Sequence, residues 1–258
     1  MSDEPIRLDR QGNVFLMSMS AGENRWNTSF TRAFDAALDD VAASDGPAAL
    51  VTASENAKFF SNGLDLEWIT SQGEHPGGDR EVFNAEIMSM FAKLMTLPVP
   101  TVCAVNGHAF GAGLMTALCH DVRVMQRDRG YLCANELELG FAIPAPELAL
   151  FRHKVPTPAF YETVQLARRW SGPDALAAGM VQALAEAEDL LELAIERAAS
   201  LAHLAANREV FGWMKEAIFG ENSALQGDHG AAYLLRNQYK YPSAPGSVPS
   251  APTRKGSS

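Results

Sequence analysis

The sequence has few cysteines and no excess of positive charge. Its 258 residues include three cysteines, Cys103, Cys119 and Cys133, an odd number without CxxC spacing, and there is no HExxH pattern. We therefore expect reduced thiols and no metal, rather than a disulfide framework. The formal net charge is −10, which repels phosphate backbones. This balance excludes nucleic acid as the expected partner.

Long hydrophobic runs are also missing. Residues 101–119 carry no formal charge, but Asn106, His108 and three glycines interrupt the run. We therefore expect no membrane span and no membrane partner. The first residues are acidic and polar, and the last five, RKGSS, match no peroxisomal or endoplasmic-reticulum address. The expected location is the cytoplasm.

Apolar patterns predict strands that alternate with helices in the first half of the chain. We expect strands over 13–20, 48–53 and 101–105. A helix capped by Asn27 or Thr28 lies between the first two, and residues 65–69 form one or two helical turns. A longer helix over about 80–97 is ended by Pro98 and Pro100. This order is typical of an α/β protein with a parallel sheet covered on both faces.

The second half of the sequence is mainly helical. We expect short strands over 121–124 and 131–133, and helices near 146–153, 157–168, 173–179, 187–205 and 207–219. As domains, we predict a core over 1–195 and a C-terminal helical region over 196–241. The proline-rich residues 242–258 are expected to form a disordered tail.

Two loops each follow an expected strand and precede an expected helix. They are 59–66 (FFSNGLDL) and 106–114 (NGHAFGAGL). In parallel sheets ligands bind at the carboxyl ends of strands, where helix N-termini supply unpaired N–H groups. The second loop lacks a Gly-Lys-Ser/Thr triplet and the full dinucleotide spacing. Taken alone, small residues before a helix more often reflect tight packing than a ligand site.

Several motifs, in one order, resemble the crotonase (enoyl-CoA hydratase/isomerase) superfamily over about residues 5–220. They are FSNGLDL at 60–66, AVNGHAFGAG at 104–113, Asp121, Asn135-Glu136 before Leu139-Gly140, and AGMV at 178–181. The resemblance implies a crotonase fold, in which repeated ββα turns form a superhelix and a C-terminal helical region serves trimerisation. It also implies acyl-CoA thioester substrates, with coenzyme A as part of the substrate and no separate cofactor. Because one fold hosts many reactions, the resemblance does not determine which reaction this protein catalyses.

The resemblance also implies roles for named residues. The backbone N–H groups of Leu64 and Ala112 correspond to an oxyanion hole, which stabilises the enolate oxygen of a thioester. Met115 stands where hydratases of the family have their first glutamate, and Glu136 matches the second. A single carboxylate suffices for a 1,3-proton shift but not for the usual hydration. The pattern therefore favours a Δ3,Δ2-enoyl-CoA isomerase with Glu136 as its base.

Other carboxylates and other functions stay open at this point. Glu147 could reach the site from the following loop, where some isomerases place their base, although a glutamate in a first helical turn also suits the helix dipole. Glu138, two residues after Glu136, is a further candidate for the base. The alternatives are another crotonase-type hydratase, lyase or hydrolase, and a catalytically silent acyl-CoA-binding protein.

The remaining candidates are expected to contact the substrate. Arg25 and Lys58 lie where the family contacts the CoA nucleotide, and Lys215 matches a position that reaches the CoA of a neighbouring subunit. A homotrimer or a dimer of trimers is expected. The full set of substrate-binding candidates is Arg25, Lys58, Phe60, Ser61, Asn62, Gly63, Asp65, Gly111, Gly113 and Met115.

Overall fold

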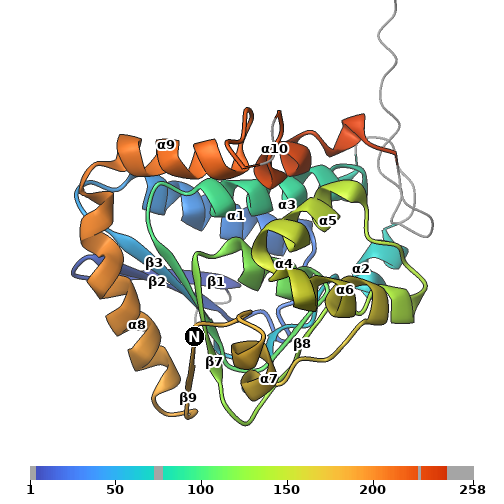
Figure 1. Cartoon of the computed structure of the whole chain (residues 1–258), viewed down its shortest axis with the longest axis horizontal. Helices are drawn as coiled ribbons and strands as arrows, with labels where there is room; N and C mark the ends of the chain where they lie inside the picture. The colour runs from blue at the N-terminus through green and yellow to red at the C-terminus, as the bar shows by residue number, and fades with distance from the viewer. Residues whose placement is uncertain (1–3, 73–77, 226–227, 243–258) are drawn as a thin grey trace, which may run out of the picture.

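The larger of two sheets runs through the centre of the molecule (Figure 1). The computed structural model describes residues 4–72, 78–225 and 228–242. The sheet has the order β1-β2-β3-β5-β7-β9, in which β1 is antiparallel to β2 and the later pairs are parallel. Its strands are β1 (Ile6–Gln11), β2 (Val14–Met19), β3 (Ala49–Ser54), β5 (Thr101–Val105), β7 (Val122–Gln126) and β9 (Ala183–Ala185).

The sequence predicts β2, β3, β5 and β7 but does not indicate β1. The reason is that β1 is an edge strand with mostly exposed, charged residues, and only Ile6 is fully buried in it. The four predicted strands lie inside the sheet and are largely buried on both faces. The α/β class expected from the sequence is confirmed.

A smaller parallel sheet gives the fold its repeating unit. It consists of β4 (Phe59–Ser61), β6 (His108–Phe110) and β8 (Leu132–Cys133), in that order. Each strand of the small sheet follows one strand of the large sheet and precedes a helix, so the chain runs through successive ββα turns. The sequence indicates loops at β4 and β6, because three residues are too few to show a strand period. Pairing of β4 with β6 brings the two candidate loops side by side.

Helices cover both faces of the larger sheet. On one face α8 (Leu190–Leu201) packs against β3 and β5. The other face packs against the main core, which includes α1 (Thr28–Ala43), α3 (Asp79–Thr96) and α4 (Ala112–Cys119). The cluster beneath α8 is Val14, Leu16, Ala49, Val51, Val102, Ala104, Val124, Ala185, Leu190, Ala194, Ala198 and Ala202.

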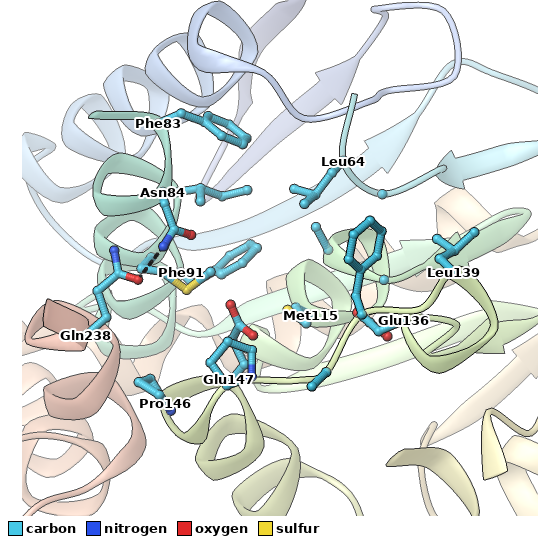
Figure 2. Close-up of a pocket in the computed structure, with 18 of the residues that line it drawn as sticks. Leu64, Phe83, Asn84, Phe91, Met115, Glu136, Leu139, Pro146, Glu147 and Gln238 are labelled. Carbon is cyan, nitrogen blue, oxygen red and sulfur yellow. Dashed lines mark hydrogen bonds between the residues drawn. The ribbon is translucent and has the colours of Figure 1, made fainter. Parts of the chain in front are cut away.

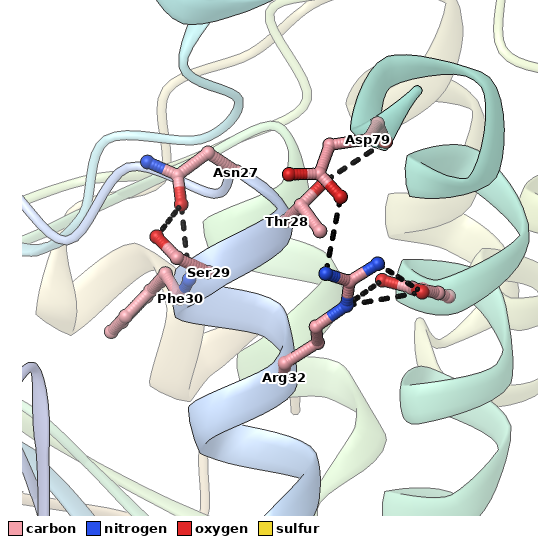
Figure 3. A network of polar contacts seen from close by, with 7 residues as sticks. Asn27, Thr28, Ser29, Phe30, Arg32 and Asp79 are labelled. Atoms are coloured by element: carbon pink, nitrogen blue, oxygen red, sulfur yellow. Dashed lines mark hydrogen bonds and ion pairs between the residues drawn. The ribbon is translucent and has the colours of Figure 1, made fainter. Parts of the chain in front are cut away.

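The starts of α1 and α3 are tied together by a polar network (Figure 3). Asn27 caps α1 by accepting a hydrogen bond from the N–H of Phe30, as its sequence position predicts. Thr28 Oγ1 donates to the backbone oxygen of Asp79 over 3.0 Å, and Arg32 pairs with the carboxylates of Asp79 and Glu86. Exposed ion pairs contribute little stability, but these contacts fix where α3 begins.

Further helices complete the second half of the chain. The helix expected over 187–205 is divided, because a 3₁₀ segment (Ala202–Ala206) follows α8; the domain boundary predicted at 195/196 falls within α8. The tail predicted over 242–258 lies, beyond Pro242, outside the described residues. Among the described helices, none has the length and hydropathy that a bilayer crossing requires. The remaining helices are α2 (Leu66–Ser71), η1 (Leu137–Leu139), α5 (Ala145–Lys154), α6 (Thr157–Leu166), α7 (Gly172–Ala177), η2 (Ala202–Ala206), α9 (Arg208–Phe219), α10 (Ala231–Arg236) and η3 (Gln238–Lys240).

Candidate active site

A cavity of about 300 Å³ lies between the two candidate loops, α3, the start of α5 and the C-terminal segment (Figure 2). Its volume is at the lower end of the range typical of small-molecule sites, roughly 300–1,000 Å³. Its lining is Arg25, Asn62, Gly63, Leu64, Leu66, Phe83, Asn84, Ile87, Met88, Phe91, Gly111, Ala112, Met115, Asn135, Glu136, Leu139, Phe141, Ala142, Pro144, Pro146, Glu147, Gln238, Tyr241 and Pro242.

Two backbone N–H groups at the cavity wall come from the two candidate loops. Ala112 is the first residue of α4, where a helix supplies no acceptor for the N–H group. Within the described residues, the N–H of Leu64 donates no backbone hydrogen bond. Gly63, with φ +77°, packs directly on the second loop: a Cβ there would lie 2.9 Å from Phe110 O and 3.8 Å from the nitrogen of Ala112. The two donors are therefore held close together by a contact that only glycine permits.

Glu136 lies beside these donors. A Cβ on Gly111 would be 3.3 Å from Glu136 Oε1, so the absence of that side chain makes room for the carboxylate. The other oxygen, Oε2, is buried without a hydrogen-bond partner among the described residues. Burial raises the pKa of Glu136 to about 7 and outweighs a hydrogen bond from its own backbone N–H, which acts in the opposite direction. A carboxyl group with such a pKa can take up and release a proton near neutral pH.

A second carboxyl group, Glu147, points into the same cavity from the first turn of α5 (Figure 2). Burial raises its pKa to about 8, and the charge of Glu136 adds to the shift. Glu138, the third candidate, is exposed instead: its carboxylate is paired with Arg169, and this pair lowers its pKa. Two carboxyl groups, rather than three, therefore face the cavity.

Apolar side chains form much of the remaining wall. Met115, which the sequence analysis matched to the first glutamate of hydratases, lines the cavity and is buried. Phe83, Ile87 and Phe91 reach it from one face of α3 at helical spacing. The space is thus suited to a hydrocarbon chain beside an acid-base centre.

The predicted substrate-binding residues divide into two groups. Five of them line the cavity, together with the four residues predicted for catalysis and the oxyanion hole; the five are Arg25, Asn62, Gly63, Gly111 and Met115. At the cavity edge the Arg25 guanidinium is 2.7 Å from Glu23, and Asn62 donates to the same carboxylate. The hydrogen bond from Asn62 and, next in size, the one from Arg25 lower the pKa of Glu23.

The other five predicted substrate-binding residues lie outside the cavity lining. Lys58 is exposed, with its ammonium group over the ring of Phe59. Ser61 is buried and donates to the backbone oxygen of Asn24, while Asp65 caps α2. The last two are Phe60, which is in the core, and Gly113, which packs against Ser61.

Lys215, the residue matched to a neighbouring subunit's CoA, is buried in its own chain. Its ammonium group is 2.8 Å from Asp121 and donates to the backbone oxygen of Val99. The sequence analysis missed other polar residues of the cavity, among them Asn84 and Gln238. The helical period of α3 could have indicated Asn84, but nothing in the sequence indicates that the C-terminal segment reaches this cavity.

Comparison with known families agrees with this geometry. The sequence model described as enoyl-CoA hydratase/isomerase matches residues 9–244, most of the chain. The chain belongs to the enoyl-CoA hydratase/isomerase family. Its superhelix of ββα turns is accordingly the crotonase fold that the motifs implied, and members of this family act on acyl-CoA thioesters.

Relatives within the enoyl-CoA hydratase/isomerase family carry several activities in their names. Enoyl-CoA delta isomerase 3 of Arabidopsis thaliana is 30% identical, covering 83% of this chain and 92% of the relative. The peroxisomal enoyl-CoA delta isomerase 1 of the same plant is 31% identical, covering 83% and 89%. Carnitinyl-CoA dehydratase of Salmonella typhimurium is 30% identical, covering 72% and 69%.

Solved structures of this family show the same fold. A probable enoyl-CoA hydratase from Mycobacterium tuberculosis superposes with a TM-score of 0.77 at 27% identity, covering 91% of this chain and 92% of that one. An apo enoyl-CoA isomerase structure from the same bacterium gives 0.75 at 26% identity, covering 91% and 96%.

Proposed function

We propose that this protein isomerises 3-enoyl-CoA thioesters to the conjugated 2-enoyl-CoA isomers. The observation that carries the proposal is the position of Glu136 beside the N–H groups of Leu64 and Ala112, with one carboxylate oxygen that has no partner among the described residues. The delta isomerase names of relatives about 30% identical to this chain support the same reaction.

The proposed chemistry moves one proton and needs no other reactant. With the thioester oxygen held by the N–H groups of Leu64 and Ala112, Glu136 removes a proton from C2. The electron pair delocalises over a dienolate, and the same carboxyl group returns its proton to C4. The double bond then lies between C2 and C3. A base of this kind contributes about 10²–10⁴-fold, and each oxyanion donor about 2.7–4 kcal/mol of barrier.

Glu147 has a supporting role in this scheme. With a pKa of about 8 it is mainly protonated at neutral pH, so that, when Glu136 is ionised, the cavity carries one negative charge rather than two. A second ionised carboxylate would repel the dienolate. We propose Arg25 at the cavity edge, and Lys58 beside the first loop, for the CoA phosphates.

The test uses purified protein with trans-3-hexenoyl-CoA and follows conjugated-enoyl absorbance and product mass. We expect conversion without a change of mass, slowed about 10²–10⁴-fold in Glu136→Gln. Glu138→Gln is the matched control, because Glu138 is exposed and paired with Arg169. Absence of conversion would contradict the reaction, and full activity of Glu136→Gln would contradict the base.

Hydration of 2-enoyl-CoA is the second candidate. It is favoured by the presence of two carboxyl groups in one cavity, one of which could activate water while the other delivers a proton. Product from trans-2-hexenoyl-CoA that is heavier by one water would identify this reaction. If neither Glu136→Gln nor Glu147→Gln forms the hydrated product, hydration requires both carboxyl groups.

A homotrimer or dimer of trimers is proposed for the assembly. It is supported by apolar side chains exposed on α9, namely Val210, Trp213 and Met214, of which Trp213 is 67% exposed. Sedimentation analysis of the wild type and of Trp213→Glu tests this: we expect a multiple of three chains and its dissociation in the variant. The cytoplasmic location stays a prediction, and one of the two Arabidopsis relatives, enoyl-CoA delta isomerase 1, is named as peroxisomal.

A further inference from the structure

A pair of amide side chains lies in the wall of the cavity. Asn84, on α3, donates from Nδ2 to Oε1 of Gln238, on η3, over 2.7 Å. Both residues line the cavity and both are only partly exposed. Figure 2 shows them on the side opposite Glu136 and Leu139, with Glu147 between the two sides. An acyl chain that extends away from the oxyanion donors toward α3 therefore meets this pair.

Each amide keeps one hydrogen-bonding group unused. Within the described residues, Asn84 Oδ1 and Gln238 Nε2 have no hydrogen-bond partner, and neither atom is fully buried. The pair thus offers one acceptor and one donor side by side. If the oxygen and nitrogen atoms of both amides are assigned the other way round, the two unused groups are again one donor and one acceptor. A hydroxyl group, which donates once and accepts, is complementary to it.

Apolar side chains share the cavity wall with the pair. Phe83, Ile87 and Met88 line the cavity from the same helix as Asn84. A plain hydrocarbon tail that filled this space would displace water from the amides without replacing its hydrogen bonds, which is unfavourable. A tail that ends in a hydroxyl would fill the apolar part and satisfy the amides.

The C-terminal segment is attached to the protein by contacts other than the amide pair. Helix α10 packs on α3 and α5 and buries Ala231, Ala232 and Leu235. Arg236 adds an ion pair with Glu216 and a hydrogen bond to Thr96. A polar pair inside a largely apolar cavity therefore calls for an explanation other than docking of this segment.

We infer that Asn84 and Gln238 form a specificity site for acyl groups that carry a hydroxyl near the end distant from the thioester. The inference rests on the proposed function, because it concerns the acyl group of the proposed substrate. Its physical basis is that a site with unpaired polar groups discriminates against a ligand that leaves them unpaired.

The test separates recognition from chemistry. Saturated acyl-CoAs, which cannot be isomerised, are compared in matched pairs of four to ten carbons, with and without an ω-hydroxyl group, by calorimetric titration. At the chain length that reaches the pair, we expect the hydroxylated ligand to bind about tenfold more tightly. In Asn84→Leu and in Gln238→Leu we expect this preference to disappear or reverse.

Arg236→Met is the matched control, because it removes a contact of the C-terminal segment outside the cavity lining. It should keep the preference for the hydroxylated ligand. Equal or tighter binding of the plain chain at every length would overturn the inference, as would an unchanged preference in both leucine variants. A preference without isomerase activity would leave the specificity site intact and contradict the proposed reaction instead.

Discussion

Glu136 and Glu147 face one cavity from two different elements, and the charge of Glu136 helps to raise the pKa of Glu147. Glu136 precedes a 3₁₀ turn, whereas Glu147 lies in the first turn of α5. Both carboxyl groups are poorly solvated, so the two together hold protons into the neutral range. This relationship gives the cavity measurable pH dependences.

The pH–rate profile should be bell-shaped with a narrow maximum. Activity should rise as Glu136 ionises, near pH 7, and fall as Glu147 ionises, near pH 8, because the second charge repels the dienolate. Glu147→Gln should keep the acid limb of kcat/KM and lose the alkaline limb. Loss of the acid limb in this variant would instead identify Glu147 as the base.

Replacing Glu147 should also change the pH dependence of stability. Its folded pKa, about 8, is above the usual value of 4.5, so the folded state binds more protons than the unfolded state between these pH values. The free energy of unfolding therefore falls as the pH rises from about 4.5, where the unfolded state ionises, and the loss is complete above the folded pKa of about 8. Glu147→Gln carries no such ionisable group. We therefore expect the difference in the free energy of unfolding between the variant and the wild type to be about 1–3 kcal/mol more favourable to the variant at pH 9 than at pH 5.

Urea unfolding at the two pH values measures this difference. Glu138→Gln is the control: Glu138 is exposed, its hydrogen bond with Arg169 lowers its pKa, and no such gain is expected. A gain for Glu147→Gln that is the same at both pH values would show that ionisation of Glu147 is not its cause.

The close approach of the two loops at Gly63 should be essential for activity. Gly63→Ala places a Cβ 2.9 Å from Phe110 O at a φ of +77°, which forces the N–H groups of Leu64 and Ala112 apart. We expect kcat to fall by about 10²–10³, the typical cost of losing one oxyanion donor.

Gly46→Ala is a matched control for this substitution. Gly46 has nearly the same conformation, with φ +75°, but a Cβ there meets no atom within 4 Å. Both alanine variants therefore strain the backbone to a similar degree, but only Gly63→Ala displaces the two loops. Equal losses of activity in both variants would attribute the effect to strain rather than to the oxyanion donors.

The sequence predicts the parts of this site that are local in the chain. Residues 59–66 and 106–114 are contiguous loops, and the position of Glu136 follows from its motif. The contact between Asn84 and Gln238 joins residues 154 positions apart, and no single-sequence pattern indicates such a pair. The same holds for Lys215, whose charge is typical of the surface but is buried against Asp121 by the packing of α9.

The buried ion pair between Lys215 and Asp121 should be a large contributor to stability. Burial alone would raise the pKa of Asp121, but the ammonium groups of Lys215 and Lys154 outweigh it and hold that pKa below the usual value. Lys215→Met leaves the Asp121 carboxylate, which is only partly exposed, with less compensation for its charge. We expect a loss of about 3–5 kcal/mol in the free energy of unfolding at pH 7.

This loss should shrink in acid. Without Lys215 the pKa of Asp121 rises, so the folded variant takes up a proton that relieves the buried charge as the pH falls. Lys93→Met is the control, since Lys93 pairs with Asp35 and Asp39 in a more exposed position and should cost about 1 kcal/mol or less. Denaturant titrations of both variants at pH 7 and pH 4.5 measure the two effects, and equal losses for Lys215→Met and Lys93→Met would contradict the role assigned to burial.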